Sequence, residues 1–211
     1  MTEGRREKSE VRMESPALSK NGRKCGGLLL EGKKVLVVGL GKTGLSTARF
    51  LVEKGAIVAA SDNKPDTKLN GLESLINMGV KVETGGHTLK TFLDAELIIL
   101  SPGVPLDIPP LVEARRRGVE IISEIELAYN FIHIPIIAVT GTNGKTTTTT
   151  LLGEVLKDRG HKVFVGGNVG TPLIEYAMGL QDAEYLVVEV SIFQLEGVMR
   201  FRHAISVLLN I

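Results

Sequence analysis

The stretch Ile136-Ile137-Ala138-Val139-Thr140-Gly141-Thr142-Asn143-Gly144-Lys145-Thr146-Thr147 decides the fold expected for this 211-residue chain. A short apolar run leads through a glycine-containing turn into a helical pattern. In such a turn backbone N–H groups point at phosphate oxygens, a lysine reaches the distal phosphates, and a hydroxyl can ligate Mg²⁺. The loop is a variant of the general P-loop pattern, because Val139 stands where a glycine is usual. The predicted ATP-binding residues are Gly141, Thr142, Asn143, Gly144, Lys145, Thr146 and Thr147.

Outward from this loop, apolar β-type runs alternate with helix-length segments along the chain. Continuous apolar strands separated by helices are typical of parallel sheets that helices cover on both faces. We therefore expect an α/β fold with two units, over residues 33–132 and 133–211, after a disordered extension over residues 1–32. The expected strands are residues 35–38, 57–60, 80–82, 97–100, 119–122, 136–139, 162–165, 185–190 and 204–209.

Composition argues against several classes of partner. A formal net charge of +1, a sequence pI near 7.8, few aromatic residues and no tryptophan give no basis for nucleic-acid binding. No apolar run approaches the roughly 18 residues of a membrane span. The only cysteine, Cys25, excludes an internal disulfide and fits a reducing compartment. We expect a cytoplasmic protein that binds small molecules and neither nucleic acid nor membranes.

The first unit opens with Gly39-Leu40-Gly41-Lys42-Thr43-Gly44, between a predicted strand and a predicted helix. This is the G-x-G-x-x-G spacing of a Rossmann-like dinucleotide site, and Asp62 ends the next predicted strand, where a ribose-binding acid is expected. Three alternatives stay open at this point: the turn binds NAD, it binds another nucleotide, or its glycines serve packing alone.

Three more stretches follow predicted strands, at the sheet edge where open α/β sheets bind ligands. They are Ser101-Pro102-Gly103, Gly166-Gly167-Asn168-Val169-Gly170 and Val188-Glu189-Val190-Ser191. Burying the Glu189 carboxylate costs free energy unless hydrogen bonds or a cation compensate its charge. A Mg²⁺ ion beside a triphosphate would compensate it. Asn168 either contacts a ligand or caps its turn.

In order and spacing these motifs resemble the Mur ligases of peptidoglycan synthesis, over residues 33–211. The stretch Phe193-Gln194-Leu195-Glu196 is the most selective part and is similar to the branch of the family that adds D-glutamate. Ile192 departs from the pattern, which usually has serine there. The resemblance implies a Rossmann-like first unit and a P-loop second unit. It also implies an ATP-dependent ligase that joins D-glutamate to UDP-N-acetylmuramoyl-L-alanine through an acyl phosphate.

The resemblance also assigns roles to residues. Lys145, Asn168 and Glu189 are expected to be catalytic, and Thr146 and Glu189 to hold Mg²⁺. The pyrophosphate of the substrate is expected at the first glycine turn in place of NAD. The predicted substrate-binding residues are Gly41, Lys42, Thr43, Gly44, Asp62, Asn63, Lys64, Ser101, Pro102, Gly103 and Asn168.

Full-length members of the family, which we expect to be monomers, continue into elements that supply the amino-acid site. We therefore expect residues 133–211 to be an incomplete central domain and this chain by itself to form no product. Two alternatives from other classes remain, a nicotinamide-dependent oxidoreductase and a nucleotide-binding module without catalysis.

Overall fold

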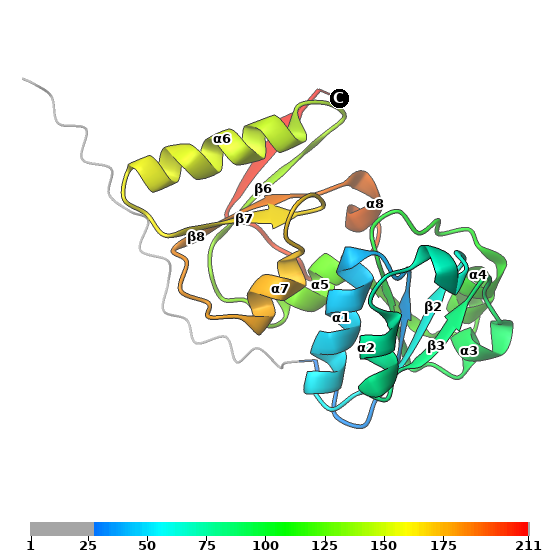
Figure 1. Ribbon diagram of the computed structural model, residues 1–211. Coiled ribbons are helices and arrows are strands. Elements are labelled where there is room, and N and C mark those ends of the chain that lie inside the picture. Colours follow the sequence, from blue (N-terminus) through cyan, green and yellow to red (C-terminus); the bar gives the residue numbers. More distant parts are fainter. Residues whose placement is uncertain (1–27, 211) are drawn as a thin grey trace, which may run out of the picture.

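The computed structural model describes residues 28–210 and contains two parallel sheets that a short helix connects (Figure 1). The first sheet has the strand order β3-β2-β1-β4-β5, and the second has the order β7-β8-β6-β9. Every strand pairing is parallel, which confirms the predicted α/β fold.

The strands are β1 (Lys34–Val38), β2 (Ile57–Asp62), β3 (Lys81–Thr84), β4 (Leu97–Leu100), β5 (Glu120–Ser123), β6 (Ile136–Gly141), β7 (Val163–Gly167), β8 (Tyr185–Glu189) and β9 (Ile205–Leu209). The α-helices are α1 (Lys42–Glu53), α2 (Leu72–Asn77), α3 (Leu89–Leu93), α4 (Pro109–Arg116), α5 (Glu124–Tyr129), α6 (Lys145–Asp158), α7 (Leu173–Met178) and α8 (Ile192–Leu195).

Helices cover both faces of the first sheet because its strands are apolar on both faces. Successive side chains of a strand point to opposite faces. Val35 and Val37 pack in the same core cluster as residues of α1, whereas Leu36 and Val38 pack with Phe92 of α3 and with residues of α4. The continuous apolar runs in the sequence therefore mark strands that are buried on two sides.

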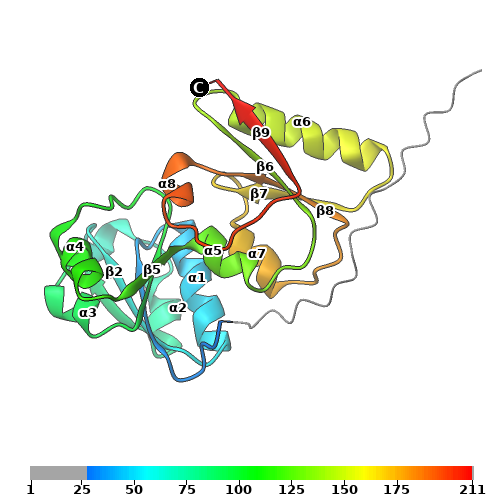
Figure 2. The ribbon, with the colours of Figure 1, turned by 180° about the vertical axis from the view of Figure 1, so that it is seen from behind.

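The second sheet divides its side chains in the same way. Ile137 and Val139 of β6 pack with residues of α6 on one face, and Ile136 and Ala138 pack with residues of α5 and α7 on the other. The cluster that contains Ile136 also holds Val35 and Val37, so the two sheets share one core. Both ribbon views show α1, α5 and α7 gathered where the sheets meet (Figures 1 and 2). The two units therefore pack against each other through this shared core and are not separated by an extended linker.

Each predicted strand is present within two residues of its expected bounds. The predicted boundary near residue 133 falls between α5 and β6, and the division into domains stays a prediction. Packing starts before residue 33, since Leu30 is buried and the Gly32 N–H donates to the Gly55 carbonyl at 2.8 Å. The rest of the predicted extension, with Cys25, lies outside the described residues.

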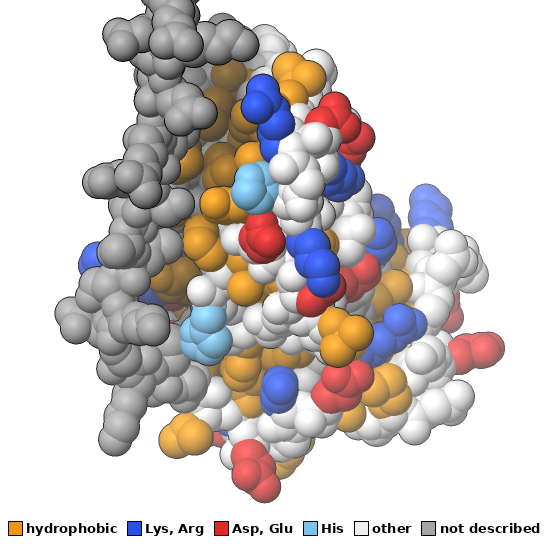
Figure 3. Space-filling model, turned by 90° about the vertical axis from the view of Figure 1, so that its left-hand side faces the viewer, with side chains coloured by type: hydrophobic (Ala, Val, Ile, Leu, Met, Phe, Trp, Pro, Cys, Tyr) orange, Lys and Arg blue, Asp and Glu red, His pale blue; other side chains and the backbone are white. Residues whose placement is uncertain are grey.

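The surface carries charges of both signs. Among the side chains visible in Figure 3, those of Lys and Arg are interspersed with those of Asp and Glu, and apolar side chains lie between them. Within residues 28–210, no helix has the length and apolar character that a membrane crossing requires.

Candidate functional site

The predicted phosphate loop joins β6 to α6. Gly144 has a positive φ of 79°, and a Cβ atom on Gly141 would lie 1.8 Å from the Leu209 carbonyl oxygen. Both positions therefore need glycine, one for backbone conformation and one for close packing against β9. Lys145 folds back over the loop, and its Nζ donates to the carbonyls of Gly141 at 2.8 Å and Thr142 at 3.3 Å. The ammonium thus lies over the turn that would hold phosphates.

A buried carboxylate lies beside this loop. Glu189 ends β8 between β6 and β7, and only 3 % of its surface is exposed. Thr146 Oγ1 donates to its Oε2 at 2.8 Å, and Asn168 Nδ2 donates to its Oε1 at 3.1 Å. The Asn168 backbone N–H also donates to the Glu189 carbonyl at 2.8 Å. The structure therefore brings the two residues predicted to hold the metal, Thr146 and Glu189, together with Asn168, which is predicted to contact the substrate.

The side chains around Glu189 can be compared with the ligands that Mg²⁺ takes in nucleotide sites. Among the described residues there is no group of three or more His, Cys, Asp or Glu side chains that could hold a metal ion. Mg²⁺ in nucleotide sites commonly takes one or two carboxylates, with the remaining ligands supplied by phosphates and water. Glu189 and the Thr146 hydroxyl offer such a partial ligand set, and both groups that donate to the carboxylate side chain are neutral.

The glycine turn of the first unit is held from two sides. A Cβ atom on Gly44 would lie 1.8 Å from the Gly39 carbonyl oxygen, so α1 begins directly against the turn. Ser101 Oγ donates to that same carbonyl at 2.7 Å. A Cβ atom on Gly41 would meet nothing within 4 Å. The turn is therefore closed toward the sheet and open on the side where a ligand would approach.

Asp62 holds the other side of the turn. Its carboxylate accepts hydrogen bonds from the backbone N–H groups of Leu40, at 2.5 Å, and Lys64, at 2.7 Å, and it is 8 % exposed. The sequence predicts that Asp62 contacts the substrate. In the structure, its carboxylate also holds the backbone of the glycine turn through Leu40. The predicted substrate-binding residues of the first unit lie at or just after the carboxyl ends of β1, β2 and β4, which adjoin one another: Gly41, Lys42, Thr43, Gly44, Asp62, Asn63, Lys64, Ser101, Pro102 and Gly103.

Two hydrogen bonds join the first two turns of α1 to the second unit. Lys42 Nζ donates to the Gly170 carbonyl at 2.9 Å, and Ser46 Oγ donates to Glu175 Oε1 at 2.8 Å. We name these two bonds the inter-unit contact. Because Gly170 is in the same loop as Asn168, the contact brings the two predicted sites next to each other. No sequence motif predicts a role for Ser46 or Glu175.

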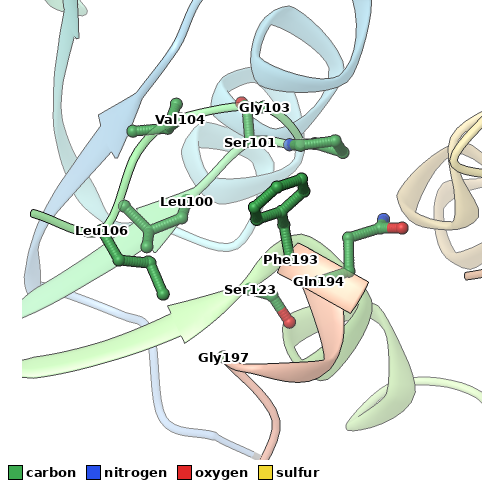
Figure 4. A pocket seen from close by; sticks show the side chains of 10 residues that line it. Leu100, Ser101, Gly103, Val104, Leu106, Ser123, Phe193, Gln194 and Gly197 are labelled. Carbon is green, nitrogen blue, oxygen red and sulfur yellow. The ribbon is translucent and has the colours of Figure 1, made fainter. Parts of the chain in front are cut away.

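A pocket lies between the loop of residues 100–106 and α8. Phe193 lines it and remains 64 % exposed, and its ring lies beneath the segment from Ser101 to Gly103 (Figure 4). Ser191 begins α8 with a reciprocal capping box in which Gln194 takes part. The cap sets the direction of the helix that carries Phe193. Phe193 is part of the motif Phe193-Gln194-Leu195-Glu196, but its position in a pocket was not predicted from the sequence.

Two glutamates of α5 attach this helix to the second unit. Glu124 Oε1 accepts the Ile174 N–H at 2.7 Å at the start of α7, and Glu126 accepts the backbone N–H groups of Met199, Arg200 and Phe201. Complete burial raises the pKa of Glu124 to about 7. The Ile174 hydrogen bond opposes this increase, and the neighbouring Glu175 charge adds to it. A titrating group thus lies at the junction of the two units.

Comparison with known protein families matches both units. Residues 33–123 match the Mur ligase MurD-like N-terminal domain, and residues 139–211 match the Mur ligase middle domain. Proteins named UDP-N-acetylmuramoylalanine--D-glutamate ligase are similar over 183 residues, which is 86% of this chain. The one from Geotalea daltonii is 52% identical and the one from Koribacter versatilis is 50% identical. The chain spans about 40% of the length of these relatives.

A solved structure shares the fold. It is that of UDP-N-acetylmuramate:L-alanyl-gamma-D-glutamyl-meso-diaminopimelate ligase from Neisseria meningitides, which matches with a TM-score of 0.50 and 22% identity. The match covers 85% of this chain and 60% of that one. At this identity the likeness concerns the fold alone.

Proposed function

The chain belongs to the Mur ligase family, and on that premise we propose that it serves the ATP-dependent joining of D-glutamate to UDP-N-acetylmuramoyl-L-alanine. In this proposal the first unit binds the uridine diphosphate part of the substrate, and the second unit binds ATP and Mg²⁺. The identity of about half of the matched residues to the D-glutamate ligases supports this branch of the family.

One observation carries the proposal, namely the arrangement of Lys145, Thr146, Asn168 and Glu189 around the phosphate loop. The Lys145 ammonium over the loop would neutralise the distal phosphates, and Thr146 and Glu189 would hold Mg²⁺. When bound, this ion would offset negative charge on the phosphates. Asn168 contacts the Glu189 carboxylate through its side chain and lies in the loop that meets the first unit. It is thus suited to contact the muramoyl substrate near the transferring phosphoryl group.

The proposed reaction has two steps. A carboxylate oxygen of the L-alanyl group attacks the γ-phosphorus of ATP, the bond from that phosphorus to the bridging oxygen breaks, and ADP leaves. The amine of D-glutamate then attacks the acyl carbon, a C–N bond forms, inorganic phosphate leaves, and the nitrogen loses a proton. Both steps bring anions together, so fixed positive charge and preorganised donors are the main requirement on the protein.

The first glycine turn supports the assignment of the uridine diphosphate. Its backbone is held by Ser101 and Asp62, and Gly41 leaves space for a ligand to approach the start of α1. A helix N-terminus of this kind favours an anion such as a pyrophosphate. The remaining parts of the proposal are that the protein acts in the cytoplasm as a monomer and has only small-molecule substrates.

A chimera tests the proposal. In it, this chain replaces the 183 residues that it matches in the Geotalea daltonii ligase. We expect the chimera to form UDP-N-acetylmuramoyl-L-alanyl-D-glutamate with release of ADP and phosphate, as measured by chromatography of the products. The same chimera with Lys145→Ala is the matched negative control. A folded chimera that binds ATP but never forms this product with D-glutamate would contradict the proposed activity.

A further inference from the structure

The two predicted nucleotide sites are joined by a continuous path of hydrogen bonds. It begins at the first turn of α1, where Lys42 reaches the Gly170 carbonyl at 2.9 Å. The loop that ends at Gly170 also holds Asn168, whose side chain reaches Glu189 at 3.1 Å. Glu189 in turn accepts from Thr146, next to Lys145 of the phosphate loop, at 2.8 Å. Thus the loop of residues 167–170 contacts both sites.

This loop has little freedom to move independently of its neighbours. A Cβ atom on Gly167 would lie 2.3 Å from the Glu189 carbonyl oxygen, and the Gly167 N–H donates to the Thr171 carbonyl at 2.8 Å. Helix α7 begins at Leu173, two residues after Thr171. A displacement of α7 relative to α1 would therefore move Asn168 relative to Glu189.

The bond from Ser46 to Glu175 fixes that relation between helices. Ser46 is 6 % exposed and lies one turn after Lys42 on α1, and Glu175 lies in the first turn of α7. The side-chain oxygens are 2.8 Å apart. The buried Glu124 of α5 accepts the Ile174 N–H at 2.7 Å, so the start of α7 is held from α1 and from α5. Neither Ser46 nor Glu175 belongs to the predicted ligand-binding sets.

We propose that Ser46 and Glu175 are positioning residues that couple the two nucleotide sites, by holding the loop of Asn168 against both. This rests on the proposed function, since it takes the uridine substrate and ATP as the two ligands. A ligand at the first glycine turn fixes the start of α1, and through the Ser46 to Glu175 bond it favours the loop position that completes the site around Glu189. Linkage requires the reverse effect to be equally large.

Isothermal titration calorimetry measures this coupling. The affinity for a non-hydrolysable ATP analogue with Mg²⁺ is determined with and without saturating UDP-N-acetylmuramoyl-L-alanine, and the ratio of the two Kd values is the coupling factor. We expect tighter binding by about fivefold or more in the parent chain. Ser46→Ala and Glu175→Ala remove one partner each and should bring the factor close to one. Binding of either ligand alone should change little, because neither residue contacts it.

The conservative variant Glu175→Gln separates positioning from charge. Its side-chain carbonyl can still accept the Ser46 hydrogen bond, so the coupling factor should stay at the parent value. Glu184→Ala, which removes an exposed carboxylate of the same unit that pairs with His161, is the matched control and should also leave the factor unchanged. Thermal unfolding followed by circular dichroism identifies variants that have lost structure in general.

The outcomes are distinct. A parent factor near one, or an unchanged factor in both alanine variants, would overturn the coupling while leaving the proposed function intact. Binding of the ATP analogue with no binding of the uridine ligand would instead overturn the proposed function, and the coupling with it. Loss of coupling in the alanine variants, together with its retention in Glu175→Gln, is the result that the structure predicts.

Discussion

The two glycine turns of this chain follow parallel strands in the same way but are completed differently. In the first, between β1 and α1, the turn is held by a serine hydroxyl and a carboxylate, and the nearby Lys42 points away to Gly170. In the second, between β6 and α6, Lys145 folds over the loop itself, and a threonine hydroxyl and a buried carboxylate lie beside it. Of the two turns, only the second has its own lysine ammonium over its carbonyls.

This difference indicates a division of labour. A diphosphate that is only bound needs backbone N–H groups and space, which the first turn offers. During transfer of a phosphoryl group, negative charge develops on its oxygens in the transition state, and fixed cations and bound metal ions stabilise that charge. In the proposed function, Lys145, Thr146 and Glu189 of the second site would meet this need. In the proposed function, the same strand-to-helix geometry would therefore serve binding in one unit and chemistry in the other.

Removal of the Lys145 ammonium should have the largest effect, because it should abolish most of the catalytic contribution of the second turn and leave the first turn unaffected. We expect Lys145→Ala in the chimera with the Geotalea daltonii ligase to lower the rate of ligation on the order of 10²-fold or more, because stabilisation of a transferring phosphoryl group is lost. Binding of the uridine substrate should be almost unchanged. Steady-state kinetics and calorimetry measure the two effects. Unaltered turnover would remove the phosphate loop from the mechanism.

The pH dependence of stability should report on the junction between the two units. The pKa of Glu124 is about 7 in the folded chain and ordinarily 4.5. Between these values the folded chain holds a proton that the unfolded chain has released, so the free energy of unfolding should fall as the pH rises through this window. The gap of about 2.5 between the two pKa values corresponds to about 3 kcal/mol.

Urea unfolding of the parent and of Glu124→Gln, at pH values from 5 to 8, isolates this effect. The glutamine can still accept the Ile174 N–H but does not titrate. We expect its free energy of unfolding to change less with pH than that of the parent. Equal slopes for the two chains between pH 5 and 7 would show that Glu124 titrates normally.

A pair of glycine variants sharpens the account of the first turn. Gly44→Ala places a Cβ atom 1.8 Å from the Gly39 carbonyl oxygen, and we expect it to lower the free energy of unfolding by about 2 kcal/mol. Gly41→Ala meets no atom within 4 Å and should leave stability unchanged while it weakens uridine-nucleotide binding. Chemical denaturation and calorimetry measure both. Equal stability of the two variants would contradict the packing described for Gly44.

The sequence predicted the sheets and the polar residues at their edges because both follow from local patterns. Strands such as Leu97–Leu100 are apolar at every position, and only a sheet covered on both faces buries such a run. Thr146 and Glu189 are 43 residues apart, yet both follow from the rule that the carboxyl ends of parallel strands share an edge. Their contact is observed, and their role at a metal stays a prediction.

The contacts between the units could not be predicted, because they depend on how the two sheets pack. Ser46 and Glu175 are separated by 129 residues, and each resembles an ordinary helix residue in the sequence. Glutamates are mostly exposed in proteins, but Glu124 and Glu126 are buried and accept backbone N–H groups of the second unit. The hydrophobic periodicity of the sequence does not identify carboxylates that accept hydrogen bonds from distant segments of the chain.

The central claim is that the first turn binds a uridine nucleotide and the second binds ATP. Calorimetry of the parent chain with UDP-N-acetylmuramoyl-L-alanine, UDP, NAD and ATP with Mg²⁺ tests it most directly, with Gly41→Ala and Lys145→Ala beside it. We expect Gly41→Ala to weaken binding of the uridine ligands and Lys145→Ala to leave it unchanged, with the opposite pattern for ATP. Tight NAD binding at the first turn, with no signal from either uridine ligand, would contradict it.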